Sequence, residues 1–224
     1  MNFEPQIPEW GLDDFKKHQD KLFEYHEWLK NTAIKTGLIS KKTDQFIWDE
    51  FIIHSLYFAK LIKKFKNLNE CEIIDLGTGA GIPGIPISIV NKTKVSLVDN
   101  KQKRIYELER LVKILNLNNA KPTKKDAKTI LKEAKNSIIV MRCYVSTSNI
   151  LKTLEKKQLK DNNLTIFVSS NSQSSEIFNS MFHVKQEKFL INKNNFRYID
   201  VITDMWNLYP YYVKRAVLEK PLLL

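Results

Sequence analysis

Three glycines at alternate positions, with an aspartate just before them, are the residues of this sequence best suited to ligand chemistry. Gly77, Gly79 and Gly81 follow Asp75, which ends a short apolar run that begins at residue 73. Glycine has no Cβ and adopts positive φ, so a turn of this kind lets the backbone lie close to a ligand that carries a nucleoside. The segment therefore predicts a strand, a ligand-binding turn and then a helix.

The spacing of the glycines narrows the choice of ligand. A dinucleotide fingerprint, G-x-G-x-x-G, needs its third glycine at position 82, where this chain has isoleucine. A Walker loop needs Lys-Ser or Lys-Thr directly after its last glycine, and here these glycines are followed directly by Ile82 and Pro83. The pattern that remains, D-x-G-x-G-x-G, is typical of sites for S-adenosylmethionine, a ligand without phosphate.

A second acid supports the same ligand. The next predicted strand, 94–98, is followed by Asp99, roughly 20 residues beyond the glycines, where a carboxylate can accept hydrogen bonds from both ribose hydroxyls. The alternative is a turn that only closes a β-α unit, with Asp99 as a helix N-cap. We favour the cofactor site and expect these residues to form it: Asp75, Gly77, Thr78, Gly79, Gly81 and Asp99.

A parallel sheet must position these residues. Strands are predicted at 72–76, 94–98, 117–123, 137–141, 164–169, 182–191 and 196–204, and helices at 83–90, 101–115, 147–159 and 174–181, with one more beginning at Asp126. Alternation of this kind implies right-handed crossovers. We predict an α/β fold, a Rossmann-like seven-stranded sheet of the class I S-adenosylmethionine methyltransferase type, whose last two strands are antiparallel.

Two helices with apolar faces, at 12–30 and 43–66, precede this pattern, and Thr43 can cap the second one. His54 lies within it and is interpreted as a packing residue. We expect a helical extension at 1–69, a methyltransferase domain at 70–205 and a tail at 206–224. The aromatic and basic residues of the tail could stack on RNA or dock on the domain.

The chain is strongly basic, with 36 Lys and Arg against 25 Asp and Glu among 224 residues and a net charge of +11. This charge favours a polyanionic partner such as nucleic acid, although the codon bias of an AT-rich genome also enriches lysine. The sequence has no apolar run of about 18 residues and no leader pattern, so we expect a soluble, cytoplasmic protein with no membrane partner. Its histidines lack metal-ligand spacing, and no metal is expected.

Arg142 follows the predicted strand at 137–141 and should point into the crevice at the carboxyl edge of the sheet. We interpret it as a catalytic residue; the alternative is an ion pair with a neighbouring carboxylate. Lys103 and Arg104, early in the helix at 101–115, are candidate RNA-binding residues or part of a solvated helix face.

The methyl acceptor can be inferred from missing motifs. The [DNS]-P-P-[YFW] turn of exocyclic-amine methyltransferases is replaced by M-R-C-Y, and Cys143 lacks the Pro-Cys context of pyrimidine carbon methylation. A ring nitrogen such as guanine N-7 is already nucleophilic and needs no general base, which fits this sequence.

Residues 75–86 resemble the bacterial small-subunit ribosomal RNA guanine-N-7 methyltransferases, also called glucose-inhibited division protein B. They nearly match D-[VIL]-G-[ST]-G-x-G-[FLI]-P-G-[IL]-P, and the family's K-R pair and the arginine of its S-R-A also have counterparts here. The resemblance implies cofactor contacts from Gly77, Ile82, Asp126, Ala127 and Arg142. It also implies a guanine target in the decoding-region loop of 16S rRNA or of the small ribosomal subunit; we expect a monomer.

The chain departs from the family pattern at three places. The family's R-H-x-x-D-S in the second helix is represented here by Glu50, Phe51, His54 and Ser55. Its R-[AV]-E after the third strand is represented by Lys125, Asp126 and Ala127. Its Lys-Gly at the end of the fifth strand is replaced by Ser169 and Ser170. Two hypotheses follow: an active rRNA methyltransferase, or a catalytically silent protein that binds rRNA or the assembling small subunit. The retained Asp75, Asp99, Arg142 and glycines favour the enzyme.

Overall fold

The computed structural model of the chain describes residues 3–64, 71–142, 146–154, 159, 161–170, 183–192 and 195–203. Cys143, the helix predicted at 174–181 and the tail at 206–224 lie outside these residues. Within the described ranges, no helix is long and apolar enough to cross a membrane.

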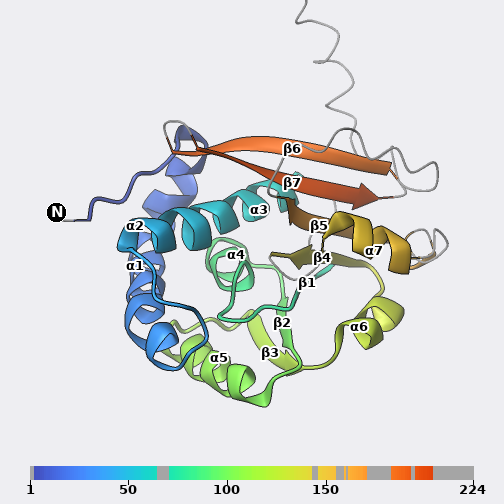
Figure 1. The fold of residues 1–224 in the computed structure, drawn as a ribbon, viewed down its shortest axis with the longest axis horizontal. Helices are drawn as coiled ribbons and strands as arrows, with labels where there is room; N and C mark the ends of the chain where they lie inside the picture. Colours follow the sequence, from blue (N-terminus) through green and yellow to red (C-terminus); the bar gives the residue numbers. More distant parts are fainter. Residues whose placement is uncertain are drawn as a thin grey trace, which may run out of the picture.

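The fold is built on a seven-stranded sheet with the order β3-β2-β1-β4-β5-β7-β6 (Figure 1). Its strands are β1 (Glu72–Leu76), β2 (Val95–Asp99), β3 (Ala120–Lys124), β4 (Ser137–Met141), β5 (Leu164–Ser170), β6 (His183–Asn192) and β7 (Asn195–Thr203). Strands β1 to β5 are parallel, whereas β7 is antiparallel to both β5 and β6. The predicted α/β sheet with an antiparallel closing pair is confirmed.

Helices cover both faces of the sheet, because successive side chains of a strand point to opposite sides. On one face, Ile73 packs in a core with α4 (Gly84–Val90), α5 (Gln102–Ile114) and the N-terminal helices. On the other, Ile74 packs with α6 (Ala127–Glu133) and α7 (Thr147–Thr153). Successive residues of β1 therefore contribute to the core on each face of the sheet.

The N-terminal helices share the first of these cores. They comprise η1 (Glu9–Gly11), α1 (Leu12–Trp28), its continuation η2 (Leu29–Ala33), α2 (Asp44–Phe46), η3 (Ile47–Ile53) and α3 (His54–Ile62). Tyr25 and Trp48 are fully buried in the same apolar cluster as Ile73. As predicted, Thr43 caps the second helix, since its Oγ1 accepts a hydrogen bond from Phe46 N–H at 3.2 Å. The division at residues 69 and 70 falls outside the described residues and stays a prediction.

Several element boundaries differ from the sequence prediction, most of them by one or two residues, and the helix predicted at 147–159 ends at Thr153, because Leu154 is extended. The third strand begins at Ala120 rather than at 117, because Leu117 N–H still bonds to Val112 O and completes the end of α5. Pro83 is the N-cap of α4 rather than its first residue. These differences move element ends and leave the topology unchanged.

Candidate functional site

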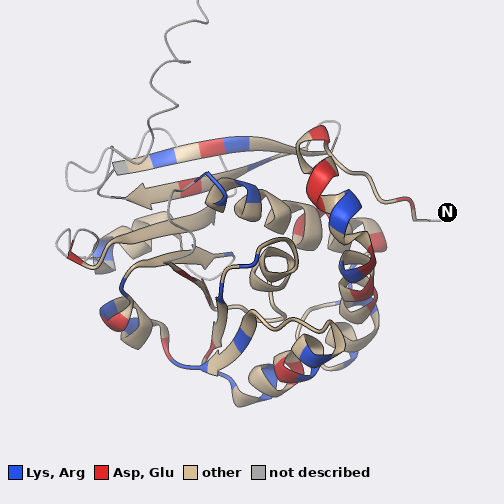
Figure 2. Cartoon of the chain, turned by 180° about the vertical axis from the view of Figure 1, so that it is seen from behind, with Lys and Arg blue, Asp and Glu red and all other residues tan. Residues whose placement is uncertain are grey.

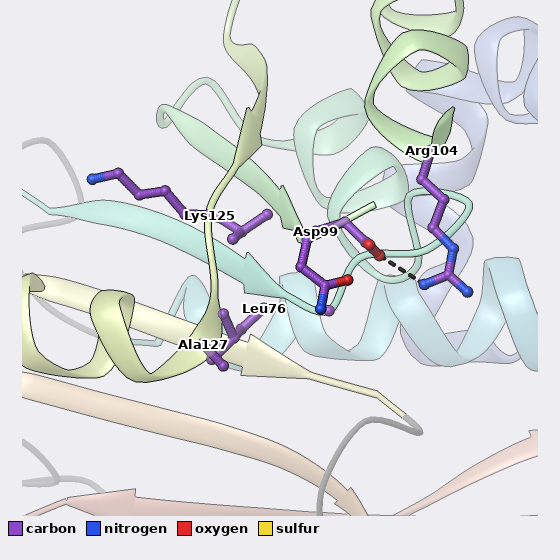
Figure 3. A pocket seen from close by; sticks show the side chains of 8 residues that line it. Leu76, Asp99, Arg104, Lys125 and Ala127 are labelled. Carbon is purple, nitrogen blue, oxygen red and sulfur yellow. Dashed lines mark hydrogen bonds and ion pairs between the residues drawn. The ribbon is translucent and has the colours of Figure 1, made fainter. Parts of the chain in front are cut away.

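The carboxyl ends of β1, β2 and β3 meet at one edge of the sheet and border a pocket (Figure 3). The strand order reverses between β1 and β4, and doubly wound sheets bind their ligands beside such a point. The pocket contains about 300 Å³ of empty space, its open mouth included. Its lining residues are Leu76, Gly77, Val98, Asp99, Asn100, Arg104, Lys125 and Ala127.

Asp75 supports the glycine turn from inside the protein. Its side chain is fully buried, and Oδ2 accepts hydrogen bonds from Thr78 Oγ1 at 2.6 Å and from Gly84 N–H at 2.7 Å. Burial disfavours the charged carboxylate and raises the pKa of Asp75 to about 7. In this structure Asp75 therefore joins the turn to the start of α4.

The three glycines have different surroundings, although all adopt positive φ, at 78°, 58° and 92°. Among the described residues, a Cβ on Gly79 would meet only Gly77 O within 4 Å, at 3.9 Å. A Cβ on Gly81 would overlap Ile85 Cγ1 and lie 3.2 Å from Leu108 Cδ2. Gly79 thus leaves open space beside the turn, whereas Gly81 allows close packing with the helices.

Asp99 lies in the pocket with both carboxylate oxygens hydrogen-bonded. Oδ1 accepts from Lys101 N–H at 2.9 Å, and Oδ2 accepts from Gly79 N–H at 3.2 Å and from Arg104 Nη1 at 2.8 Å. The side chain thereby fixes the glycine turn against the end of β2. The N-cap of α5 is Lys101, so Asp99 is not the capping residue of that helix.

The other residues predicted for cofactor binding divide between the pocket and its surroundings. Ala127 lines the pocket, whereas Asp126 is the exposed N-cap of α6 and its Oδ1 accepts from Thr129 N–H at 2.9 Å. Ile82 is buried in the apolar core. Among the described residues, no group of three or more His, Cys, Asp or Glu side chains is placed to hold a metal ion.

The pair predicted to contact RNA has partners within the chain. Arg104 bonds to Asp99, and Lys103 Nζ donates to Thr36 O at 2.9 Å. Figure 2 shows basic and acidic residues mixed along α1 and α5. The charge excess is therefore not concentrated on these two helices.

Arg142 follows β4, and its guanidinium is bound by the N-terminal helices. Nη2 lies 3.3 Å from Glu50 Oε2, Nε donates to His54 Nδ1 at 3.4 Å, and Cζ lies 5.0 Å from the centre of the Phe51 ring. The ion pair that the sequence left as an alternative is present. Arg142 is absent from the pocket lining within the described part of the chain.

Glu50 joins Arg142 to β7, the strand beside the edge strand β6. Arg197 of β7 donates from Nε to Glu50 Oε2 at 3.2 Å and from Nη2 to Oε1. Burial opposes the charge of Glu50, but the hydrogen bonds from Arg197 and the positive charges of Arg197 and Arg142 lower its pKa to about 2. Sequence reasoning noted Glu50 only as a departure and missed Arg197, since nothing local links residues so far apart.

Comparison with solved structures defines the class of the fold. The structure titled human methyltransferase 10 domain containing protein has a TM-score of 0.58 and 14% identity, over 84% of this chain and 98% of that one. The METTL16 methyltransferase domain has a TM-score of 0.56 and 13% identity, over 88% and 92%. At such identities the likeness shows the fold alone, which is a methyltransferase fold.

The sequence comparisons are more specific. A family model described as GidB, rRNA small subunit methyltransferase G, matches residues 18–196. The chain belongs to this family, and the predicted resemblance is confirmed.

Curated relatives carry the same family name, Ribosomal RNA small subunit methyltransferase G. The protein from Flavobacterium johnsoniae is 30% identical over 131 residues, 58% of each chain. The protein from Dictyoglomus thermophilum is 36% identical, over 50% of this chain and 46% of its own length. The protein from Mesoplasma florum is 29% identical, over 76% of this chain and 71% of its own length. The chain thus matches about half the length of the first two relatives.

Proposed function

We propose that this protein transfers a methyl group from S-adenosylmethionine to guanine N-7 in the decoding-region loop of 16S rRNA. One observation carries the proposal: Gly79, where a side chain would enter open space, donates its N–H to Asp99 at the carboxyl ends of β1 and β2. An adenosyl ligand needs both a backbone without a side chain and an acid for its ribose. The names of the relatives support ribosomal RNA as the substrate.

The pocket residues match this ligand in their chemistry. Asp99 would accept the ribose hydroxyls, using the remaining capacity of Oδ1 and the position on Oδ2 that Arg104 now occupies. Leu76, Val98 and Ala127 offer apolar surface for an adenine ring. When bound, S-adenosylmethionine supplies a methyl group activated by a positively charged sulfur.

The protein's own part in the reaction is positioning. The lone pair of guanine N-7 is free at neutral pH, so no side chain has to remove a proton, and fixed geometry provides most of the acceleration. We assign Arg142 to the catalytic side of the site, where it would orient the reacting groups. We further propose that the protein acts as a monomer on rRNA or on the small ribosomal subunit.

Binding and transfer can be tested in sequence. Calorimetric titration with S-adenosylmethionine should show one site per chain. Tritiated methyl transfer to small subunits and to naked 16S rRNA lacking the modification should then label one guanine, which borohydride and aniline cleavage identifies as N-7-methylated. Binding without incorporation into either RNA would favour the silent, rRNA-binding alternative. Absence of both binding and incorporation would overturn the proposal.

A further inference from the structure

A buried cluster of charged residues surrounds the guanidinium of Arg142 at the end of β4. Glu50 is 7% exposed and His54 3% exposed, and the side chain of Arg142 is 9% exposed. Ionised groups are costly to bury unless they are paired. The charged side chains of this cluster are therefore held in position more strictly than those of a surface ion pair.

Contacts with three residues of the N-terminal helices constrain the orientation of Arg142. Glu50 binds Nη2, His54 binds Nε, and the ring of Phe51 lies against Cζ. All three residues belong to one stretch of helix, and Glu50 and His54 are four residues apart, a spacing that places them on the same helical face. The N-terminal helices thus contact Arg142 directly, in addition to packing on the sheet.

The protonation state of His54 is consistent with this arrangement. Burial lowers its pKa to about 4, so the imidazole is neutral at pH 7. Arg142 Nε donates to Nδ1, which requires the proton of the neutral ring to be on Nε2. Glu50 is then the ionised carboxylate of this cluster, and it pairs with both Arg142 and Arg197.

The neighbouring carboxylate, Asp49, provides a matched comparison. It is 6% exposed, and its hydrogen bonds come from Gln45 Nε2 at 2.9 Å and Asn192 Nδ2 at 2.8 Å. Like Glu50, it links the N-terminal helices to the β6-β7 pair. In the described structure its hydrogen-bond partners are amides, whereas those of Glu50 include Arg142.

We propose that Glu50 is a positioning residue for methyl transfer. It holds the Arg142 guanidinium at the carboxyl end of β4, and Arg197 of β7 holds Glu50 in turn. The inference rests on the proposed function for its consequence in catalysis. Its structural part, the immobilisation of Arg142 by Glu50, can be measured without cofactor or RNA.

The first measurement is side-chain NMR of ¹⁵N-labelled protein. The Arg142 Nε–H signal is assigned by its loss in Arg142→Lys, and exchange between the two Nη signals correlated with it reports rotation about the Nε–Cζ bond. We expect rotation at least about tenfold faster in Glu50→Gln than in wild type, as a lost pair interaction of about 1.4 kcal/mol would give. Asp49→Asn should leave this rate unchanged. If Glu50→Gln does not fold, Glu50→Asp, which keeps the charge but shortens the reach, takes its place.

The second measurement is transfer to small subunits. Glu50→Gln should lower the transfer rate about tenfold, and Asp49→Asn should change it less than threefold. In an Arg142→Ala background, Glu50→Gln should cause no further loss, because the two residues act as one unit. Unchanged rotation in Glu50→Gln, or a full additional loss in the Arg142→Ala background, would overturn the inference. If the wild-type protein transfers no methyl group, the proposed function is overturned instead. The NMR rates still decide in that case whether Glu50 immobilises Arg142.

Discussion

Arg104 Nη1 lies 2.8 Å from Asp99 Oδ2, at the carboxylate expected to receive the ribose of the cofactor (Figure 3). The arginine comes from the first turn of α5 and the aspartate from the end of β2. A ribose hydroxyl and the guanidinium would therefore compete for the same oxygen. Arg104, which the sequence offers as a candidate RNA-binding residue, thus also lines the proposed cofactor pocket.

The first prediction concerns this competition. Arg104→Gln should tighten binding of S-adenosylhomocysteine by up to about fivefold, because the lost ion pair is partly exposed and worth no more than about 1 kcal/mol. Calorimetric titration measures the change. Arg110→Gln, which removes an exposed pair with Glu107 on the same helix, is the control and should have no effect. Weaker binding in Arg104→Gln would mean that Arg104 contacts the ligand itself.

The second prediction concerns the acid of that pair. Asp99→Asn should weaken cofactor binding by about tenfold or more, since a neutral amide accepts hydrogen bonds less strongly than a carboxylate. Asp200→Asn is a suitable control, because Asp200 is also buried but bonds to Thr147 and Gln186 away from the pocket lining. Equal binding by wild type and Asp99→Asn would remove Asp99 from the site.

The third prediction separates two glycines of the turn. Gly79→Val should abolish cofactor binding, because its side chain enters the open space beside the turn, and should lower the melting temperature moderately, because valine at a φ of 58° is strained by about 1–2 kcal/mol. Gly81→Val should lower the melting temperature more than Gly79→Val, because in addition to its strained φ its side chain would overlap Ile85. Thermal unfolding and calorimetry of both variants test this contrast. Normal binding by Gly79→Val would contradict it.

The fourth prediction concerns the pH dependence of stability. The pKa of Asp75 rises from 3.8 to about 7 on folding, because burial disfavours its charge. The folded protein therefore binds the extra proton between these values, and the contribution of Asp75 to stability is largest below pH 3.8 and is lost as the pH rises through 7. The free energy of unfolding of wild type, relative to Asp75→Asn, should fall by a few kcal/mol between pH 4 and 8.

Urea unfolding of both proteins at several pH values provides that comparison. Taking the difference between the two proteins cancels the titration of other groups, including His54, whose low pKa makes stability fall in the opposite direction as the pH drops from 6.5 toward 4. A difference that does not depend on pH would show that Asp75 keeps an ordinary pKa when folded.

The sequence by itself determined the strands of the sheet and the position of the glycine turn after β1. Strand β1, the glycine turn and the acid after β2 follow from local rules: apolar runs, the conformational freedom of glycine, and the spacing of one β-α unit. These signals act over a few residues, so one sequence contains them in full.

Only the tertiary structure decided which side chains meet. Glu50 reaches Arg142 and Arg197 across 92 and 147 residues, and it does so because the N-terminal helices pack on the sheet beside β4 and β7. From the sequence alone, Asp75 could face either a ligand or Gly84, because its place in the motif is the same in both cases. Arg104 could likewise point either to solvent or to Asp99. Periodicity fixes the face on which a side chain lies, but the partner on that face depends on how distant elements pack.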